Sequence, residues 1–336
     1  MVGLATIQKL HDIQPHPNPE VEKLEVAKIK AWSVVVPKGQ YKEGDLVVFI
    51  CIDSILPDDG KFEFMRKQKF RVWNARFKGY PSQGLVQPIS ILSDVIDYPV
   101  NIGLGDDVSE LLGITKYEKP LDVSVSGEQQ CHFPTHFISI SDELNLLGYP
   151  EALNELDGKE VVVTQKADGS STTFINSFEE NSFMACTRRF AMKEGSGFPW
   201  RIVEKYDLKN KLSNYNIVIQ GETIGPKLNG NRLGLKDIEL RVFRAKNLST
   251  GMTLSYDMLE EMCEKFNIPT VKFIDRFVFD KNVHSVELFQ NLANLQTYPN
   301  GNAGEGIVIA PVVPFYSTVL GKEWSVKVIN QSYKQD

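Results

Sequence analysis

Residues 164–171 carry the side chains of this sequence whose types and spacing suit covalent chemistry. They read Thr-Gln-Lys-Ala-Asp-Gly-Ser-Ser and follow an apolar run at 161–163 that is typical of a buried strand. Lys166 is a candidate nucleophile toward phosphorus if nearby cations and burial lower its pKa from about 10.4 to roughly 7–8. Asp168 lies on the same face of an extended segment, where it could hold the waters of a metal ion, and Gly169 would let the backbone approach a nucleotide. Many surface turns share this K-x-D-G pattern, so its meaning depends on partners elsewhere in the chain.

Four later segments that look like strands each carry a charged or aromatic side chain at a distinctive place. Glu222 ends an apolar strand within Gly-Glu-Thr-Ile-Gly, and Glu305 opens another very apolar strand. Phe243 lies in an alternating strand, on the face opposite its aliphatic neighbours, and Lys327 lies in the middle of an apolar strand. Each segment alone is compatible with an ordinary sheet. Together they supply carboxylates, a cation and an aromatic ring that could surround Lys166.

The order of these motifs resembles the covalent nucleotidyltransferases, namely DNA ligases, RNA ligases and mRNA capping enzymes. Ser170 and Ser171 stand where DNA ligases usually carry an arginine, and the chain stops nine residues after Lys327, where DNA ligases and capping enzymes continue into an OB domain. A segment that looks like a barrel lies at the N-terminus instead. The chain therefore resembles the ATP-dependent RNA ligases with an N-terminal OB domain and a C-terminal nucleotidyltransferase domain. Three segments of the first domain resemble the same group: 41–50, 82–85 and 107–117.

The resemblance implies a reaction in three steps. Lys166 attacks the α-phosphate of ATP, releases pyrophosphate and carries AMP. The AMP passes to an RNA 5′-phosphate, and an RNA 3′-hydroxyl then displaces it to seal the strand. Asp168, Glu222 and Glu305 would hold Mg²⁺ or Mn²⁺ through waters, because these ions prefer oxygen ligands and reduce the charge repulsion at the α-phosphate. The implied substrate is RNA with 3′-hydroxyl and 5′-phosphate ends, as in a nicked duplex, and the implied role is RNA repair.

The resemblance also implies a nucleotide-binding set. Its members are Gln165, Lys166, Arg188, Glu222, Phe243, Val308 and Lys327. Phe243 would stack on adenine with Val308 opposite, although simple alternation from Glu305 favours Ile307. Arg188 would contact the sugar or the RNA, and Lys327 would neutralise the α-phosphate and help to lower the pKa of Lys166.

Three positions depart from the family pattern. Gln165 stands where RNA ligases often have glutamate, so an acceptor for the adenine amine remains without its charge. The family commonly has two lysines in the last motif, and here Ser325 stands in place of the first. Lys322 could take over the role of that missing lysine. Asn145 lies where an arginine usually grips the triphosphate, a task that Arg189 could take over. These departures keep two alternatives open: a DNA ligase or capping-type nucleotidyltransferase, and a protein that binds RNA ends on a ligase scaffold without sealing them.

The sequence predicts an α+β protein with an OB-type β-barrel at residues 1–118, a linker at 119–134 and a nucleotidyltransferase domain of mainly antiparallel sheets with flanking helices at 135–336. Turn residues separate short strands in the first domain, a pattern that an SH3-like barrel would share. The expected strands there are 24–29, 33–37, 46–52 and 84–88. In the second domain we expect helices at 141–147, 199–212, 258–266 and 286–295, and strands at 161–164, 172–178, 183–187, 217–220, 239–244, 306–310 and 324–329.

Residues 61–78 interleave basic and aromatic side chains against the lone acid Glu63. The cations could follow a phosphate backbone while the aromatic rings stack on bases or ribose. The aromatic rings could equally fill the barrel and leave the cations in solvent. The sequence keeps both interpretations open.

Composition limits the remaining classes. The chain has 336 residues, 42% hydrophobic and 24% charged, and a net charge of −6, which argues against indiscriminate coating of nucleic acid. Charged residues interrupt every apolar run before the ~18 residues that a membrane span needs, and the N-terminus lacks a signal-peptide core. We therefore expect an intracellular, cytoplasmic monomer with no membrane partner. The four scattered cysteines predict free thiols and neither a zinc site nor disulfides.

Overall fold

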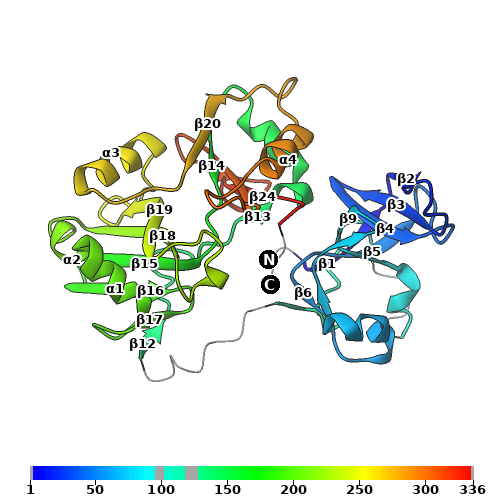
Figure 1. Ribbon diagram of the computed structural model, residues 1–336, viewed down its shortest axis with the longest axis horizontal. Coiled ribbons are helices and arrows are strands. Elements are labelled where there is room, and N and C mark those ends of the chain that lie inside the picture. The colour runs from blue at the N-terminus through cyan, green and yellow to red at the C-terminus, as the bar shows by residue number, and fades with distance from the viewer. Residues whose placement is uncertain (1–2, 95–101, 118–127, 334–336) are drawn as a thin grey trace. The chain divides into compact units, whose positions relative to one another are not determined.

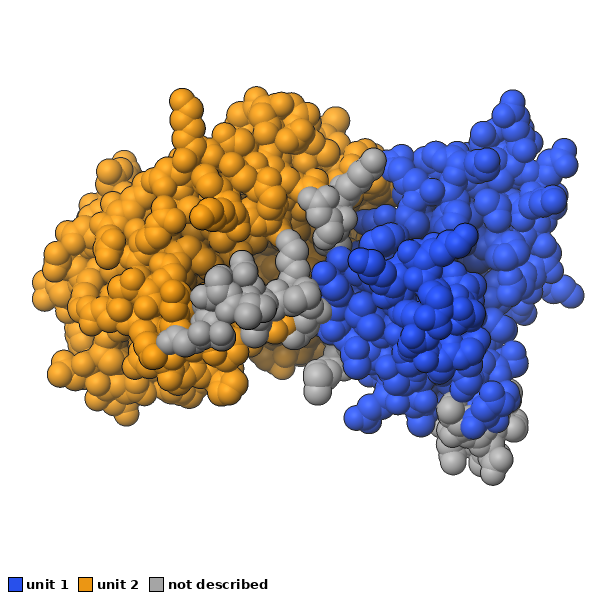
Figure 2. Space-filling model, turned by 60° about the horizontal axis from the view of Figure 1, so that its bottom comes forward, with its two compact units in different colours: residues 1–120, 334–336 blue, residues 121–333 orange. Residues whose placement is uncertain are grey.

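The computed structural model describes residues 3–94, 102–117 and 128–333 (Figure 1). The chain forms two compact units, Met1–Pro120 with Lys334–Asp336, and Leu121–Tyr333, which Figure 2 shows in blue and orange. The part of the expected linker up to residue 127 lies outside the described residues. The domain boundaries given by the sequence, 1–118 and 135–336, stay a prediction.

The first unit consists of short antiparallel strands arranged in small sheets (Figure 1). One sheet has the order β1-β5-β10, a second β2-β3-β4, a third β11-β6-β7, and β8 pairs with β9. Its strands are β1 (Ala5–Lys9), β2 (Asp12–Pro15), β3 (Leu24–Ile29), β4 (Trp32–Pro37), β5 (Leu46–Ile50), β6 (Ser54–Ile55), β7 (Arg71–Val72), β8 (Asn74–Phe77), β9 (Tyr80–Gln83), β10 (Leu85–Pro88) and β11 (Thr115–Lys116). Two 3₁₀ helices, η1 (Gly60–Gln68) and η2 (Ile89–Leu92), add Phe62 and Leu92 to the core between the sheets. The four strands expected here are confirmed.

The basic and aromatic stretch at 61–78 divides between the two interpretations. Phe62 is fully buried and Phe70 packs against the same core, so these rings fill the barrel. Phe64, Trp73 and Phe77 are exposed by 54%, 38% and 44%, so their rings are available at the surface. Arg66 is ion-paired with Asp58 and Glu63.

The second unit contains two larger sheets (Figure 1). One is a six-stranded antiparallel sheet in the order β12-β17-β16-β15-β18-β19, and the other is a five-stranded sheet in the order β13-β24-β21-β14-β20. The strands are β12 (Gln129–His132), β13 (Leu144–Asn145), β14 (Glu160–Gln165), β15 (Ser170–Ser177), β16 (Ser182–Thr187), β17 (Phe190–Met192), β18 (Ile217–Ile224), β19 (Glu239–Asn247), β20 (Phe273–Val278), β21 (Gly306–Pro311) and β24 (Val326–Ile329), with the small pair β22 (Tyr316–Ser317) and β23 (Lys322–Glu323). Only β13 pairs in parallel among the described strands, which agrees with the predicted α+β class.

Helices cover one face of each large sheet. Trp200 of α1 (Gly197–Tyr206) and Leu259 of α3 (Tyr256–Phe266) join Phe174 and Leu240 in a core against the six-stranded sheet. Residues from α4 (Val286–Asn294) and the 3₁₀ helix η5 (Pro150–Leu156) form the core against the five-stranded sheet, together with Val161, Ile307 and Val328. The opposite face of each large sheet is not covered by these helices. Polar side chains at the strand ends there can form a site.

Two of the helix predictions are wrong in detail. The helix expected at 199–212 breaks at Asp207, whose φ of 53° ends α1, and the chain restarts as the short α2 (Leu208–Lys211). The helix expected at 141–147 is instead an extended segment that enters β13, followed by the 3₁₀ turn η4 (Leu146–Gly148), because the side chain of Asn145 caps that turn. Helices α3 and α4 and the seven strands expected in this domain are confirmed, whereas β20 and its pairing with β14 were not foreseen.

All four cysteines are free, as predicted. Within the described ranges, each helix is too short or too polar to cross a bilayer.

Candidate active site

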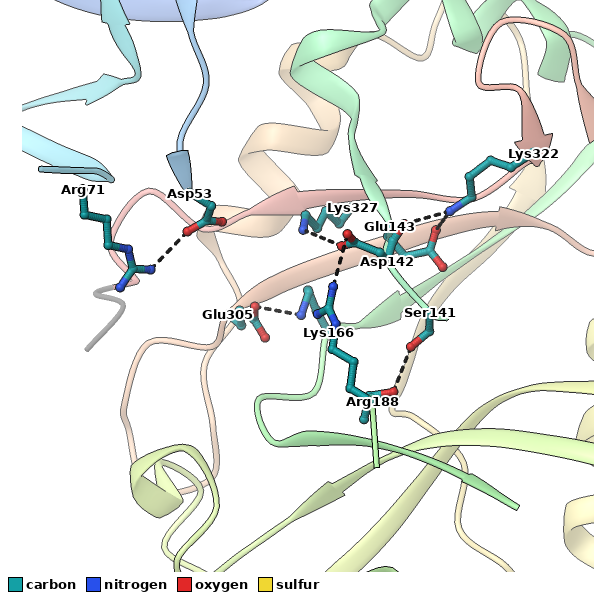
Figure 3. Close-up of polar contacts among 11 residues, drawn as sticks. Asp53, Arg71, Ser141, Asp142, Glu143, Lys166, Arg188, Glu305, Lys322 and Lys327 are labelled. Carbon is teal, nitrogen blue, oxygen red and sulfur yellow. Dashed lines mark hydrogen bonds and ion pairs between the residues drawn. The ribbon is translucent and has the colours of Figure 1, made fainter. Parts of the chain in front are cut away.

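Lys166 directly follows β14, an inner strand of the five-stranded sheet. The pairing of β14 with β21 continues past Gln165, because the Lys166 N–H donates to the Gly306 carbonyl over 2.9 Å. This hydrogen bond brings Lys166 beside Glu305. The Nζ of Lys166 lies 2.7 Å from Glu305 Oε1 (Figure 3). The first expectation from the sequence, that Lys166 lies beside the carboxylate of a distant strand, therefore matches the structure.

Alternation along the five-stranded sheet decides which side chains share a face with the site. Ile307 is fully buried in the apolar core, whereas Val308 pairs with Thr164 on one side and Lys327 on the other. Cross-strand partners point to the same face, so Val308, Thr164 and Lys327 form a row. Counting from Glu305 favoured Ile307 and was wrong, because Gly306 with its φ of +146° breaks the alternation at the start of β21.

Carboxylates, rather than cations, are the nearest charged neighbours of the Lys166 amine. Burial acts to lower the pKa of Lys166, but the charges of Glu305, Glu222 and Asp168 outweigh it and raise that pKa above its ordinary value. Burial, with repulsion from Glu305, raises the pKa of Glu222 to about 8 even though Lys166 opposes it. The sequence predicted that surrounding positive groups lower the pKa of Lys166; in this structure the excess of acids reverses the sign.

Asp168 is fully buried and held by three donors. Its Oδ1 accepts from Asn229 Nδ2, and its Oδ2 accepts from the Tyr333 hydroxyl over 2.7 Å and lies 3.5 Å from Arg232 Nε. The guanidinium of Arg232 also stacks over the Tyr333 ring at 4.7 Å. Asp168 thus fastens the loop around Asn229 and the segment after β24 to the strand end that carries Lys166.

The acids fit a divalent cation only in part. Across residues 3–94, 102–117 and 128–333, no three or more His, Cys, Asp or Glu side chains are grouped closely enough to ligate one metal ion. Glu222 and Glu305 nonetheless lie near the Lys166 ammonium, and the pKa of each carboxyl is raised. A hard divalent cation would bind their oxygens and reduce the repulsion between the two carboxylates. Asp168 already uses both oxygens in hydrogen bonds, so it suits a role in positioning better than direct coordination.

The remaining cations of the predicted nucleotide-binding set converge on one acid. Arg188, which follows β16, places Nη2 3.2 Å from Asp142 Oδ2, and Lys327 places Nζ 4.0 Å from Asp142 Oδ1 (Figure 3). Burial raises the pKa of Glu305, and Lys327 lies close enough to Glu305 to counteract part of that rise. The structure therefore brings Lys166, Lys327 and Arg188 to one region.

Gln165 and Phe243 occupy distinct environments. The Gln165 amide nitrogen donates to Gln296 Oε1 and to the Thr297 carbonyl, both over 3.2 Å, and these two hydrogen bonds orient the side-chain amide. Phe243 is half-buried on β19 and, like Arg241, alternates with the fully buried Leu240 and Val242 as predicted. The alternation ends there, because the register with β18 shifts: Gly221 aligns with Val242 and Gln220 with Arg244.

The departures from the family pattern have structural explanations. Asn145 accepts from the Leu147 N–H as the cap of η4, so its side chain serves the backbone. Lys322 donates to the Asp142 carbonyl and to Glu143 Oε2, each over 3.0 Å, and is thus engaged at the edge of the site. Ser325 is half-buried just before β24, in the alternation of Lys327.

Gly169 serves strand packing. A Cβ at this position would lie 2.2 Å from the Thr223 carbonyl oxygen of β18, so only glycine permits the approach of the two backbones. The sequence assigned Gly169 to an approach to nucleotide; its close contact is with β18, which brings Glu222 toward Lys166.

Sequence reasoning missed Asp142, Tyr333 and Arg232 as neighbours of the site. Asp142 was visible only as part of a supposed helix cap, and Tyr333 is separated by most of the domain from Asp168. Periodicity gave no signal for these contacts because they depend on how the ends of the two sheets meet.

Replacing Tyr333 with phenylalanine is expected to lower the free energy of unfolding by about 1–3 kcal/mol, because a buried carboxylate at Asp168 loses a donor. Chemical denaturation measures this change. The matched control is Tyr316→Phe at an exposed tyrosine, for which we expect a change within about 0.5 kcal/mol. Equal effects of both substitutions would show that the Tyr333 hydroxyl does not support Asp168.

Both units of the chain are similar to known proteins. A family model described as RNA ligase matches residues 159–329, and an OB-fold domain model matches residues 4–89. Naegleria gruberi RNA ligase with PPi is similar at 28% identity and a TM-score of 0.84, over 99% of this chain and 98% of that one. Two variants of that ligase are also similar, each at 28% identity and a TM-score of 0.83. For a lysine-to-alanine variant with ATP and Mn, the match covers 98% of this chain and 98% of that one. For a glutamate-to-alanine variant with AMP and Mn, it covers 98% of this chain and 97% of that one. No curated protein sequence matches the chain.

The chain combines an OB-fold unit with a two-sheet domain that has a lysine among carboxylates at the end of an inner strand. The match to the RNA ligase model spans more than half of the chain, and the likeness to a solved RNA ligase spans nearly all of it. The chain belongs to the RNA ligase family. The SH3-like alternative for the first unit is excluded by the OB-fold match.

Proposed function

We propose that this ligase consumes ATP to join an RNA 3′-hydroxyl to a 5′-phosphate through a lysyl-AMP at Lys166 and an RNA-adenylate. The observation that carries the proposal is the Lys166 amine at the end of β14, 2.7 Å from Glu305 and close to Glu222. Lys327 lies near the same Glu305. We further propose that the enzyme acts as a monomer on nicked duplex RNA in repair. The consumption of ATP fits a location in the cytoplasm.

The first step forms a bond between Lys166 Nζ and the α-phosphorus and breaks the bond from that phosphorus to the α–β bridging oxygen. Pyrophosphate leaves. The Lys166 ammonium loses one proton to solvent before the attack and a second after it, so that the phosphoramidate nitrogen keeps one hydrogen; the two protons return when the phosphorus–nitrogen bond breaks. In the second step the phosphorus–nitrogen bond breaks as an oxygen of the RNA 5′-phosphate attacks. In the third, the RNA 3′-hydroxyl loses its proton to solvent as its oxygen attacks the 5′-phosphate, and AMP leaves.

The residues of the site divide these tasks. Lys327 binds phosphate oxygens. The resemblance implied that Arg188 contacts the sugar or the RNA; because Arg188 shares Asp142 with Lys327, we propose that it binds a phosphate oxygen as well. Gln165 accepts from the adenine amine, and Phe243 and Val308 contact the adenine faces. Glu222 and Glu305 hold the divalent cation, with Asp168 fixing the strand end from which Lys166 extends. A bound Mg²⁺ or Mn²⁺ neutralises acids that otherwise raise the pKa of Lys166 and withdraws charge from the α-phosphate.

The experiment that tests the proposal is incubation with α-labelled ATP and Mn²⁺, followed by a chase with nicked duplex RNA. We expect acid-labile label on the protein, its loss when a chelator removes the metal, and sealed RNA after the chase. Labelling by GTP instead, or sealing of nicked DNA alone, would support the capping or DNA ligase alternatives. Labelling without any sealing would support an RNA-end-binding role.

For the first unit, we propose that the β8–β9 hairpin and its flank contact RNA. Trp73, Arg76, Phe77 and Lys78 are exposed there, which joins stacking surfaces to cations. Replacing Phe77 with alanine is expected to weaken RNA binding about tenfold, since stacking of one base contributes about 1–3 kcal/mol. Fluorescence anisotropy with nicked duplex RNA measures the affinity.

The control for this prediction is Phe178→Ala, at an aromatic ring of similar exposure in the second unit. We expect its RNA affinity to equal that of the unchanged protein. If Phe77→Ala binds RNA as tightly as this control, the hairpin is not an RNA contact.

A further inference from the structure

We propose that Asp142 competes with the nucleotide phosphates for Lys327 and Arg188 and thereby limits the affinity of the site for ATP. The proposal rests on the function proposed above, because it takes these two cations as phosphate-binding groups. It gives a role to an acidic side chain that neither the motifs nor the predicted metal set includes.

The geometry of Asp142 is that of a bridging anion. Its Oδ2 lies 3.2 Å from Arg188 Nη2 and its Oδ1 lies 4.0 Å from Lys327 Nζ, so each oxygen faces a different cation (Figure 3). Two oxygens of one phosphate group could contact the same two cations. Asp142 thus presents to Arg188 and Lys327 the charge and oxygen pair that a phosphate would present.

The backbone around Asp142 is fixed from both large sheets. On the side of the six-stranded sheet, Gln220 Nε2 donates to the Ser139 carbonyl over 3.0 Å, and the hydroxyls of Ser141 and Ser171 are 2.9 Å apart. On the other side, Lys322 donates to the Asp142 carbonyl, and β13 pairs with β24 so that Asn145 aligns with Lys327. These contacts hold the segment in place, so we expect the carboxylate of Asp142, and not its backbone, to swing aside when phosphate binds.

Exposure makes this exchange possible. The side chains of Arg188 and Asp142 are 49% and 37% exposed, so water screens their ion pair and the pair is weak. The pair between Lys166 and Glu305 is shorter and far more buried, with exposures of 23% and 11%. A triphosphate carries more charge than one carboxylate and can accept two parallel hydrogen bonds from arginine, so it displaces Asp142 at a cost in affinity.

The same contacts admit an opposite role, in which Asp142 positions Arg188 for the nucleotide. The two roles differ in the sign of the effect when the charge is removed. A competing anion predicts tighter nucleotide binding in Asp142→Asn, and a positioning anion predicts weaker binding. Because the backbone anchors do not use the Asp142 carboxylate, the variant is expected to keep the fold.

The test measures binding of α,β-methylene-ATP, which cannot transfer AMP, by isothermal titration calorimetry. We expect Asp142→Asn to bind roughly two- to tenfold more tightly than the unchanged protein, the range for losing two weak, partly exposed ion pairs. The KM for ATP in lysyl-AMP formation should fall by a similar factor. The matched control is Glu143→Gln, which removes an equal charge from the adjacent residue but from a partner of Lys322, and should change the affinity less.

Unchanged or weaker binding by Asp142→Asn would overturn the proposal, as would an equal gain in both variants, which would indicate a general charge effect. Lysyl-AMP formation by the unchanged protein is scored separately. If the unchanged protein binds the analogue but forms no lysyl-AMP, the proposed function fails while the competition of Asp142 can still be read from the binding series.

Discussion

Replacing Lys166 with methionine is expected to lower the rate of AMP transfer from ATP to the protein by more than about a thousandfold. The methionine side chain has a similar length to that of lysine but has no amine that could attack the α-phosphorus. RNA sealing that starts from ATP is lost with it, whereas RNA that already carries a 5′-adenylate should still be sealed, because the last step does not need this amine. Labelling with α-labelled ATP and sealing of pre-adenylated RNA measure the two effects.

The control for Lys166→Met is Lys272→Met, at an exposed lysine whose backbone carbonyl accepts from Gln165. We expect that control to keep full labelling. Circular dichroism checks folding of Lys166→Met, since the substitution leaves Glu305 without its partner at 2.7 Å. Persistent labelling of a folded Lys166→Met protein would refute the assignment of the nucleophile.

The second large effect is expected at Gly306, where alanine should destabilise the second unit by about 3 kcal/mol or more. A Cβ there would lie 2.1 Å from the Val328 carbonyl oxygen, and the φ of +146° is strained for any residue with a side chain. The backbone must shift, and the Gly306 carbonyl that holds the Lys166 N–H shifts with it. Lysyl-AMP formation should therefore fall together with the midpoint of thermal unfolding.

Gly301→Ala separates strain from crowding. Gly301 has a φ of +83°, but a Cβ there meets no atom within 4 Å, so alanine costs only about 1 kcal/mol of left-handed strain. We expect normal lysyl-AMP formation in this variant. If Gly301→Ala and Gly306→Ala lose equal stability and activity, the close approach of β21 and β24 is not what requires glycine.

Much of the fold followed from local patterns, whereas the meeting of Lys166, Glu305 and Lys327 was expected only from the resemblance to RNA ligases. The apolar runs that predicted β14, β21 and β24 are buried strands. Alternation predicted that Leu240 and Val242 share one face and Arg241 and Phe243 the other, and the burial along β19 agrees up to Phe243. These features are local, so the sequence carries them directly.

Features that depend on three-dimensional packing were not accessible in the same way. The sign of the pKa shift at Lys166 depends on which of several charges approaches most closely, and Glu305 does so. The break at Asp207 and the cap at Asn145 replace predicted helical turns because single side chains favour a local alternative. The hydrogen bond between Asp168 and Tyr333 joins distant segments that no periodicity links.

The position of β14 has a consequence for biosynthesis. Its two neighbours in the sheet, β20 and β21, come far later in the chain, and Gln165 pairs with Ile307. At about 5–20 residues per second, a ribosome takes roughly ten seconds or more to deliver these partners. Until then the nascent apolar strand that leads to Lys166 has no sheet to join, which makes it a target for chaperones. If Lys166 carries AMP as proposed, we expect a nascent chain to become labelled only after the segment with Glu305 has emerged.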